Sequence, residues 1–286
     1  MTASVAIIGT TGTNSQLWTD TFLDAGWSVR SLVRDPACLA PRPGQTRAAF
    51  NLDDFADFDA ALSGVHLLAL VTPADPRQVD RESELIGAAK RVGVARIIKG
   101  SVLGANLPQP ITQFARWSGQ IEKELAAANV PYVVLRANLY MQNLLRQRQS
   151  IEAGSYVEPL GATRVTMLDV RDIAEVAVAV ANGGYDGKAL NLTGPEALSG
   201  PEVAAILSET TGRPVRFVSP DLESFKATLL SRDMPAWRSR SQVELYDAVL
   251  GGRAPHLAAI SSDVLATIGR PARTLKEFAR SAFTGT

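Results

Sequence analysis

The chain has 286 residues, 46% of them hydrophobic, and its 29 basic and 29 acidic residues give a formal net charge of zero. This length supports a large core and, with a single cysteine at Cys38, excludes a small disulfide-stapled scaffold. The balanced charge provides no global field that would attract nucleic acid or an anionic membrane. A small-molecule substrate is therefore the favoured partner.

Metal chemistry and membrane insertion are also disfavoured. The two histidines, His66 and His256, lie far apart in the sequence, so a zinc site would need carboxylate ligands, and we expect no metal. No window approaches roughly 18 consecutive apolar residues, and the N-terminus lacks a basic segment followed by an apolar stretch. We therefore expect a cytoplasmic protein, for which a homodimer is left open.

The chain opens with a pattern typical of a strand, a glycine turn and a helix. Apolar residues 5–8 lead into Gly9 and Gly12, and a helical pattern with Trp18 on its apolar face follows. Gly9 permits a tight turn, and Gly12 lets the backbone approach a pyrophosphate held at the positive end of the helix dipole. Ser15 stands at the third position of this spacing, where a glycine is usual and a small residue still allows close packing.

The residue at the end of the next strand indicates which nucleotide binds. Arg34 follows the apolar run 27–33, about 20 residues after the turn, where an NAD site would carry an acidic residue. Arginine there favours the 2′-phosphate of NADP, with the adenine half near Asn51 and Leu52. The alternatives are a turn that binds no ligand and an arginine that is merely exposed. The residues expected to bind NADP are Gly9, Thr10, Thr11, Gly12, Thr13, Asn14, Ser15, Arg34, Asn51, Leu52, Val71, Thr72 and Ser101.

Strands and helices continue to alternate, which predicts an α/β fold with a doubly wound parallel sheet of the Rossmann type. The run 66–71 is almost wholly apolar, as expected of a central parallel strand covered on both faces. Thr72 ends this strand, and Ser101 lies at the carboxyl end of the next, the edge where such sheets bind ligands. Further strands are expected near 47–50, 96–100 and 132–135, and further helices after a cap at Asp53, at 76–92 and at 112–129.

The last part of the chain is mostly helical and has shorter strands. We expect a dinucleotide-binding domain over residues 1–155 and a smaller, mostly helical C-terminal lobe over 156–286 that covers the substrate. Some strands of the second part are expected to return to the main sheet. The expected strands are 164–168, 189–192 and 215–218, and the expected helix caps are Asp169, Ser199, Ser219 and Thr274.

Several of these stretches together resemble the NmrA-like family of atypical short-chain dehydrogenases/reductases. The resemblance covers nearly the whole chain. Members that it is similar to include NAD(P)H quinone reductases, triphenylmethane reductases, imine-reducing enzymes and redox-sensing regulators that bind NADP without turning it over. The resemblance thus implies NADP(H) more strongly than it implies catalysis. It rests on the glycine turn 9–12 and on residues 32–36, 130–136, 138–143, 169–174 and 269–274.

The chain lacks the usual proton-donating pair of short-chain reductases, a tyrosine activated by a lysine four residues later. No tyrosine precedes Tyr132, and the helix positions that would carry the pair, Ala115 and Gly119, hold neither hydroxyl nor amine. The hydroxyls expected to face the nicotinamide are those of Ser101 and Tyr140, with Asn138 as a polar neighbour. An aromatic side chain packed beneath the C-terminal lobe is the equally weighted alternative for Tyr140.

Two functions fit these residues. The first is an NADPH-dependent reductase that transfers a hydride to a small electrophilic acceptor such as a quinone, an imine or iminium ion, or a conjugated carbonyl. Such acceptors need little acid help, so the missing pair can be tolerated. The second is an NADP-binding protein without redox chemistry, either a sensor or an enzyme that uses its cleft for another reaction. No motif in the sequence identifies the substrate.

Overall fold

The computed structural model describes residues 3–9, 12–231 and 234–284, and the chain divides into two compact units. The chain passes between the units several times, so the division differs from the consecutive domains 1–155 and 156–286 expected from the sequence. Unit 1 comprises Met1–Ala105, Trp117–Arg136 and Ile173–Leu190, and unit 2 comprises Asn106–Arg116, Ala137–Asp172 and Asn191–Thr286.

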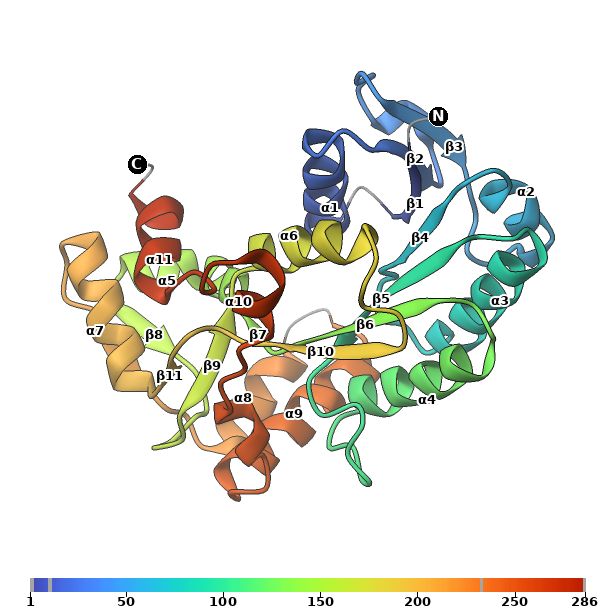
Figure 1. Ribbon diagram of the computed structural model, residues 1–286. Helices are drawn as coiled ribbons and strands as arrows, with labels where there is room; N and C mark the ends of the chain where they lie inside the picture. The colour runs from blue at the N-terminus through green and yellow to red at the C-terminus, as the bar shows by residue number, and fades with distance from the viewer. Residues whose placement is uncertain (1–2, 10–11, 232–233, 285–286) are drawn as a thin grey trace. The chain divides into compact units, whose positions relative to one another are not determined.

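A seven-stranded sheet forms the centre of unit 1, in the order β10-β6-β5-β4-β1-β2-β3 (Figure 1). The pairs β1–β2, β2–β3, β1–β4 and β4–β5 are parallel. β1 lies between β2 and β4, so the strand order reverses beside it, which confirms the predicted doubly wound fold and places a ligand-binding edge after β1. The strands are β1 Ser4–Ile8, β2 Ser28–Val33, β3 Gln45–Ala49, β4 Leu67–Leu70, β5 Arg96–Val102, β6 Tyr132–Ala137 and β10 Lys188–Leu192.

Helices cover both faces of this sheet, as a buried parallel sheet requires. On one face α2, α3 and α4 pack through buried residues such as Phe58, Leu85 and Leu125 onto Leu68 and Ile97 of the strands. On the other face lie α1 and α6 (Figure 1). The bounds are α1 Thr13–Asp24, α2 Phe58–Leu62, α3 Gln78–Arg91, α4 Gln113–Ala127 and α6 Val170–Ala181, with short 3₁₀ turns η1 Pro36–Cys38 and η2 Phe55–Asp57.

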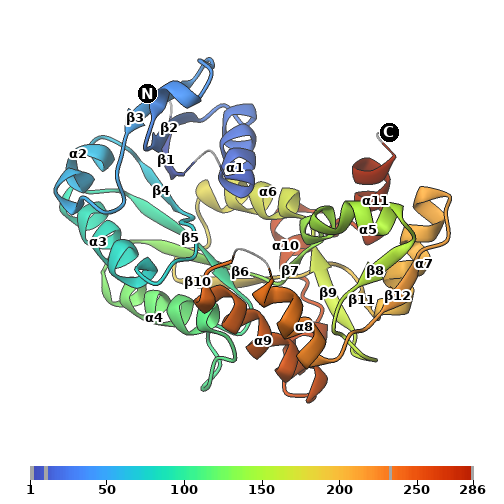
Figure 2. The ribbon, with the colours of Figure 1, turned by 180° about the vertical axis from the view of Figure 1, so that it is seen from behind.

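Unit 2 is built on two small sheets, β11-β9-β7 and β12-β8. Figure 2 shows α7 and α11 beside β8 and β12, and these elements share a core that includes Tyr156, Leu207 and Phe278. The strands are β7 Leu139–Tyr140, β8 Ser155–Val157, β9 Val165–Leu168, β11 Ala197–Leu198 and β12 Arg216–Val218. The helices are α5 Arg148–Glu152, α7 Gly200–Thr211, α8 Leu222–Leu230, α9 Ala236–Leu250, α10 Asp263–Ile268 and α11 Leu275–Phe283, with 3₁₀ turns η3 Met141–Gln147 and η4 Pro255–Ala258.

Two of the expected helix caps are wrong. The cap before η2 is Asp54, because Asp53 instead accepts hydrogen bonds from Arg81. The cap of α8 is Asp221 rather than Ser219, whose hydroxyl accepts a backbone N–H from the loop after β8. In the described ranges, no helix combines the length and the apolar character needed to cross a bilayer.

Candidate functional site

The turn between β1 and α1 adopts the geometry that its glycines predict. Gly9 has φ +66°, a left-handed conformation that favours glycine. Its N–H donates to the Leu32 carbonyl at 2.8 Å, and the Gly12 N–H donates to the Gly9 carbonyl at 3.0 Å. The turn is therefore tied to the carboxyl end of β2. Thr10 and Thr11, also expected to bind NADP, lie outside the described residues.

The N-terminus of α1 is left open by the protein. Gly12 is the N-cap residue, no described side chain caps the helix, and its first turn contains no acidic residue. A Cβ atom built on Gly12 would lie 3.6 Å from the Gly9 carbonyl oxygen, an ordinary contact, so no described neighbour requires glycine there. Thr13 and Asn14 begin the helix, and Ser15 is 6% exposed, as expected of a small residue at a packed position. The first N–H groups of a helix have no intrahelical partner and can bind an anion.

Arg34, Asn51 and Leu52 follow the neighbouring strands β2 and β3. Val33 pairs with Ala49, and Phe50 donates its N–H to the Val33 carbonyl at 2.8 Å, so these three residues leave the sheet side by side. Arg34 is exposed and makes no hydrogen bond or ion pair with the described residues. The positive charge of Arg34 nevertheless contributes to lowering the pKa of Asp53. A hydrogen bond from Arg81, followed by the charges of neighbouring arginines, holds the pKa of Asp53 below its usual value.

Val71 and Thr72 follow β4, where a buried ion pair occupies the polar groups. Lys99 Nζ lies 2.8 Å from Glu82, and the two side chains are 1% and 0% exposed. The Thr72 hydroxyl donates to the same carboxylate at 2.5 Å, and the Gln78 amide donates to it at 2.9 Å. These partners of the carboxylate all lie in unit 1, and Thr72 is engaged by it. The Oε2 atom of Glu82 has the ion pair with Lys99 but no hydrogen bond.

Ser101, on β5, belongs to a second buried network. Its hydroxyl donates to Glu122 of α4 at 2.5 Å, and the residue is 4% exposed. Arg136 of β6 donates to both oxygens of Glu122, with the shortest bond at 2.6 Å. The only proton of the Ser101 hydroxyl is therefore directed at Glu122.

The structure gives a steric reason for glycine at residue 119, the position expected from the sequence to carry the lysine of the usual pair. A Cβ atom on Gly119 would overlap the carbonyl oxygen of Ala105, so α4 approaches this backbone more closely than any side chain allows. Ala115, where the tyrosine of the usual pair was expected, is 5% exposed. A longer side chain at residue 119 would require the backbone to move.

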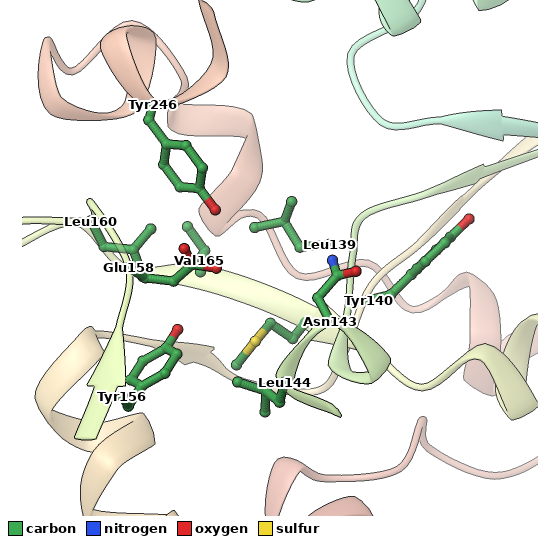
Figure 3. Close-up of a pocket in the computed structure, with 10 residues that line it drawn as sticks. Leu139, Tyr140, Asn143, Leu144, Tyr156, Glu158, Leu160, Val165 and Tyr246 are labelled. Carbon is green, nitrogen blue, oxygen red and sulfur yellow. The ribbon is translucent and has the colours of Figure 1, made fainter. Parts of the chain in front are cut away.

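Tyr140 belongs to unit 2, where it lines a pocket (Figure 3). Desolvation raises the pKa of Tyr140, so its hydroxyl stays protonated near neutral pH. Asn138, its expected polar neighbour, uses its amide to donate to Thr166 and, at 2.9 Å, to the Leu257 carbonyl, within the same unit. The pocket is lined by Leu139, Tyr140, Asn143, Leu144, Tyr156, Glu158, Leu160, Val165, Met167 and Tyr246.

Three polar side chains of this pocket face one another, and none was expected from the sequence. In Figure 3 the hydroxyls of Tyr156 and Tyr246 point toward the carboxylate of Glu158, whereas the hydroxyl of Tyr140 points away from it. Burial, the Glu158 charge and a hydrogen bond to Glu158 raise the pKa of Tyr246. Burial, followed by the Glu158 charge, raises the pKa of Tyr156. Alternation in a strand would have predicted only that Tyr156 and Glu158 share a face.

The described residues expected to bind NADP lie in unit 1, at or just after the carboxyl ends of five neighbouring strands. Tyr140 lies in unit 2. Sequence reasoning missed Glu82, Lys99 and Glu122, although a lysine within a buried parallel strand demands a partner and could have signalled such a pair. Among the described residues, no group of three or more His, Cys, Asp or Glu side chains is arranged to hold a metal ion.

Comparison with known proteins identifies relatives along the whole chain. An NAD(P)H azoreductase of Xenophilus azovorans is 38% identical over 284 residues, which cover 97% of each chain. A (4-alkanoyl-5-oxo-2,5-dihydrofuran-3-yl)methyl phosphate reductase of Streptomyces griseus is 30% identical over 281 residues, 96% of each chain. The NADPH complex of an NADPH-dependent quinone oxidoreductase of Escherichia coli superposes with a TM-score of 0.85 at 26% identity, covering 98% of this chain and 99% of that one. The model of the NmrA-like family matches residues 1–249, and the chain belongs to this family.

Proposed function

We propose that the protein is an NADPH-dependent reductase that transfers a hydride to a small, flat, electrophilic acceptor without a tyrosine–lysine pair. The predictions of an oxidoreductase and of NADP as its cofactor are confirmed by the relatives, which are named as NAD(P)H-dependent or NADPH-bound enzymes. The acceptor is proposed to be a quinone, an imine or iminium ion, or a conjugated carbonyl. The names of the relatives support this range, since they describe an azoreductase, a quinone oxidoreductase and a reductase of an oxo-dihydrofuran.

The observation that carries the nucleotide proposal is the open N-terminus of α1. Its glycine cap lacks a side-chain partner among the described residues and lacks any steric need to be glycine. A pyrophosphate bound at the helix end would explain the glycine, because the backbone N–H groups can approach the phosphates closely only where no side chain intervenes. We place the pyrophosphate at residues 9–15, the 2′-phosphate on Arg34 and the adenine near Asn51 and Leu52.

The guanidinium of Arg34 suits a phosphate because it carries several N–H donors in a fixed plane. Nearby Arg77 and Arg81 are both engaged by Asp53, at 2.6 and 2.7 Å. Arg34 has no such partner among the described residues, so it can pair with a 2′-phosphate without first breaking an ion pair. This supports a preference for NADPH over NADH.

The chain's own residues offer little acid catalysis. Gly119 cannot carry a side chain without backbone movement, and Lys99 is buried against Glu82. Ser101 directs its proton at Glu122, so it could accept a hydrogen bond from a ligand but would have to leave this network to donate one. Bound NADPH would supply the hydride. Quinones and iminium ions accept a hydride without a strong acid in the same step, which fits this set of residues.

We assign Tyr140 a supporting role. With its pKa raised by burial, it would act as a hydrogen-bond donor that orients the acceptor, and the remaining proton would come from solvent. Ser101 and Tyr140 remain the residues predicted to face the nicotinamide. A cytoplasmic location, the absence of a nucleic-acid partner and the oligomeric state also remain predictions.

NADPH oxidation by the purified protein, measured against a panel of quinones, cyclic imines, azo compounds and enones, tests this function. We expect turnover with at least one of these acceptors and tighter binding of NADPH than of NADH. Tight NADPH binding without turnover of any acceptor would overturn the reductase and favour the alternative, an NADP-binding protein without redox chemistry.

A further inference from the structure

The pocket of unit 2 has a polar end in an apolar setting. Tyr156, Glu158 and Tyr246 gather their oxygen atoms at one place (Figure 3). The remaining walls are formed by Tyr140, Asn143 and apolar side chains such as Leu144. These residues come from β8, the segment after it, α9, η3 and β9, so the pocket exists only in the folded unit. Neither the family nor the names of the relatives assign it a role.

The size of the cavity restricts what can enter. Its volume is about 30 Å³, which is enough for a group of about the size of a water molecule. An ammonium or amino group has this size, and the bulk of its molecule would remain outside.

The chemistry of the polar end favours a cationic group. Glu158 supplies a carboxylate, which accepts a hydrogen bond from Tyr246. Burial, followed by the charge of this carboxylate, raises the pKa values of Tyr156 and Tyr246, so both phenols stay neutral beside Glu158. An ammonium group can donate to a carboxylate and to phenolic oxygens at once, and charge-assisted hydrogen bonds are stronger in an apolar setting.

We propose that this pocket is a subsite that binds a cationic amino group of the hydride acceptor. The proposal rests on the reductase function proposed above. Tyr140 connects this pocket with the proposed hydride acceptor. Its side chain lines the pocket, while its hydroxyl points away from Glu158 (Figure 3). An acceptor held by the Tyr140 hydroxyl would extend its amino group past the ring to Glu158. The favoured acceptors are then flat rings that carry an alkylammonium side chain.

Two naphthoquinones of equal size test this proposal. One carries an aminoalkyl chain and the other a hydroxyalkyl chain of the same length, so they differ mainly in a positive charge. We expect wild type to favour the aminoalkyl compound in kcat/KM, and Glu158→Gln to reduce that preference roughly 10-fold or more. Glu152→Gln removes a carboxylate that is 49% exposed on α5 of the same unit, and it should leave the preference unchanged.

A binding measurement separates failure of the pocket from failure of the reductase. Calorimetry with benzylammonium chloride and with benzyl alcohol should show tighter binding of the cation to wild type, and Glu158→Gln should remove the difference. Tyr246→Phe, which keeps the ring, should weaken cation binding less. Equal binding of both probes, or an unchanged acceptor preference in Glu158→Gln, would overturn the subsite. Absence of turnover with both quinones would instead count against the reductase, while the two binding probes would still test the pocket.

Discussion

Two regions at the same edge of the main sheet differ in whether their polar groups have partners within the protein. After β1 and β2, the N-terminus of α1 and the side chain of Arg34 find no partner among the described residues. Within β5, by contrast, Lys99 pairs with the buried carboxylate of Glu82, and Ser101 donates to that of Glu122. Polar groups that the protein satisfies itself stabilise the fold, whereas those left open at a ligand-binding edge are available to a ligand.

Helix ends elsewhere in the chain sharpen this contrast. The helices α7 and α11 begin with capping boxes, in which Ser199 pairs with Glu202 and Thr274 with Glu277. The helix α1 has glycine at the corresponding position and no described side chain that replaces the cap. These two helices thus carry side-chain caps, whereas α1 has none at the end where we place the pyrophosphate. The helices α3, α9 and α10 also begin without a side-chain cap, so the glycine turn before α1 is needed to mark its end as a phosphate site.

The largest expected effect concerns the buried ion pair of Glu82 and Lys99, which we call the closed region together with the Ser101–Glu122 network. Glu82→Gln would leave Lys99 buried without a charged partner, so the free energy of unfolding should fall by about 3–5 kcal/mol. Urea denaturation followed by circular dichroism measures this change. Glu84→Gln, an exposed change on the same helix, should alter stability by less than about 0.5 kcal/mol. Equal stability of Glu82→Gln and Glu84→Gln would show that the buried pair is not structural.

The next effect concerns the open region, by which we mean the N-terminus of α1 and the side chain of Arg34. Arg34→Ala should weaken NADPH binding by about 1.5–3 kcal/mol and leave NADH binding unchanged, because only NADPH carries the 2′-phosphate. Calorimetric titration of both nucleotides measures the difference. Arg91→Ala removes an arginine that is 52% exposed and paired with Asp59, and it serves as the matched control. Parallel losses for NADH and NADPH in Arg34→Ala would contradict the assignment of the 2′-phosphate to this residue.

Tyr140 tests whether unit 2 takes part in the reaction. Tyr140→Phe should lower the rate roughly 10 to 100-fold, the effect of losing one transition-state hydrogen bond of about 1.4–2.7 kcal/mol, and should leave NADPH affinity unchanged. Steady-state oxidation of NADPH with an accepted quinone provides the rate. A mutant that turns over as fast as wild type would assign Tyr140 to packing alone.

The smallest expected effect is the acid sensitivity of a capped helix. Hydrogen bonds from the backbone and side chain of Ser199, followed by that of Arg164, lower the pKa of Glu202 from 4.5 to about 2. A lowered folded-state pKa gives stability that is present above about pH 4.5 and is lost as the pH falls toward 2. The stability difference between wild type and Glu202→Gln, followed by thermal unfolding, should therefore shrink over this range. A difference that grows on acidification would contradict the capping role.

Local patterns predicted the strand, the glycine turn and the helix of residues 4–24, whereas NADP binding there remains a prediction. The conformation of Gly9 and the position of Arg34 follow from short spacings along the chain, where a turn must fit between one strand and one helix. The doubly wound parallel sheet also followed from the alternation of elements, whereas the order of its strands required the structure. Caps were less certain, because several Asp and Ser residues often stand near one helix start. Asp54 caps η2 where Asp53 was expected, since tertiary contacts with arginines decide between adjacent carboxylates.

The closed region and the pocket could not be derived from the sequence, because their residues meet only through tertiary packing. Lys99 lies in an apolar strand, and nothing local identifies Glu82 as its partner. Tyr246, on α9, reaches Glu158 from a distant part of the chain. The close approach of Gly119 to the Ala105 backbone likewise appears only in the structure.

We propose that the end of α1 is kept open for the phosphates of NADPH, and substitution of Gly12 probes this directly. The N-cap backbone, at φ −81° and ψ 147°, accepts other residues, and a Cβ atom meets only an ordinary contact. Gly12→Asp should cap the helix, leaving the unfolding temperature unchanged or raising stability by a few tenths of a kcal/mol. It should also weaken NADPH binding by at least roughly 100-fold, about 2.7 kcal/mol, through repulsion of the phosphates.

Gly12→Asn, which has the same shape without the charge, should weaken NADPH binding less than Gly12→Asp. Calorimetric titration of both variants with NADPH, alongside their thermal unfolding, is the decisive measurement. We expect a Gly12→Asp protein that is folded but has lost its affinity for the nucleotide. A Gly12→Asp protein that binds NADPH as tightly as wild type would contradict it.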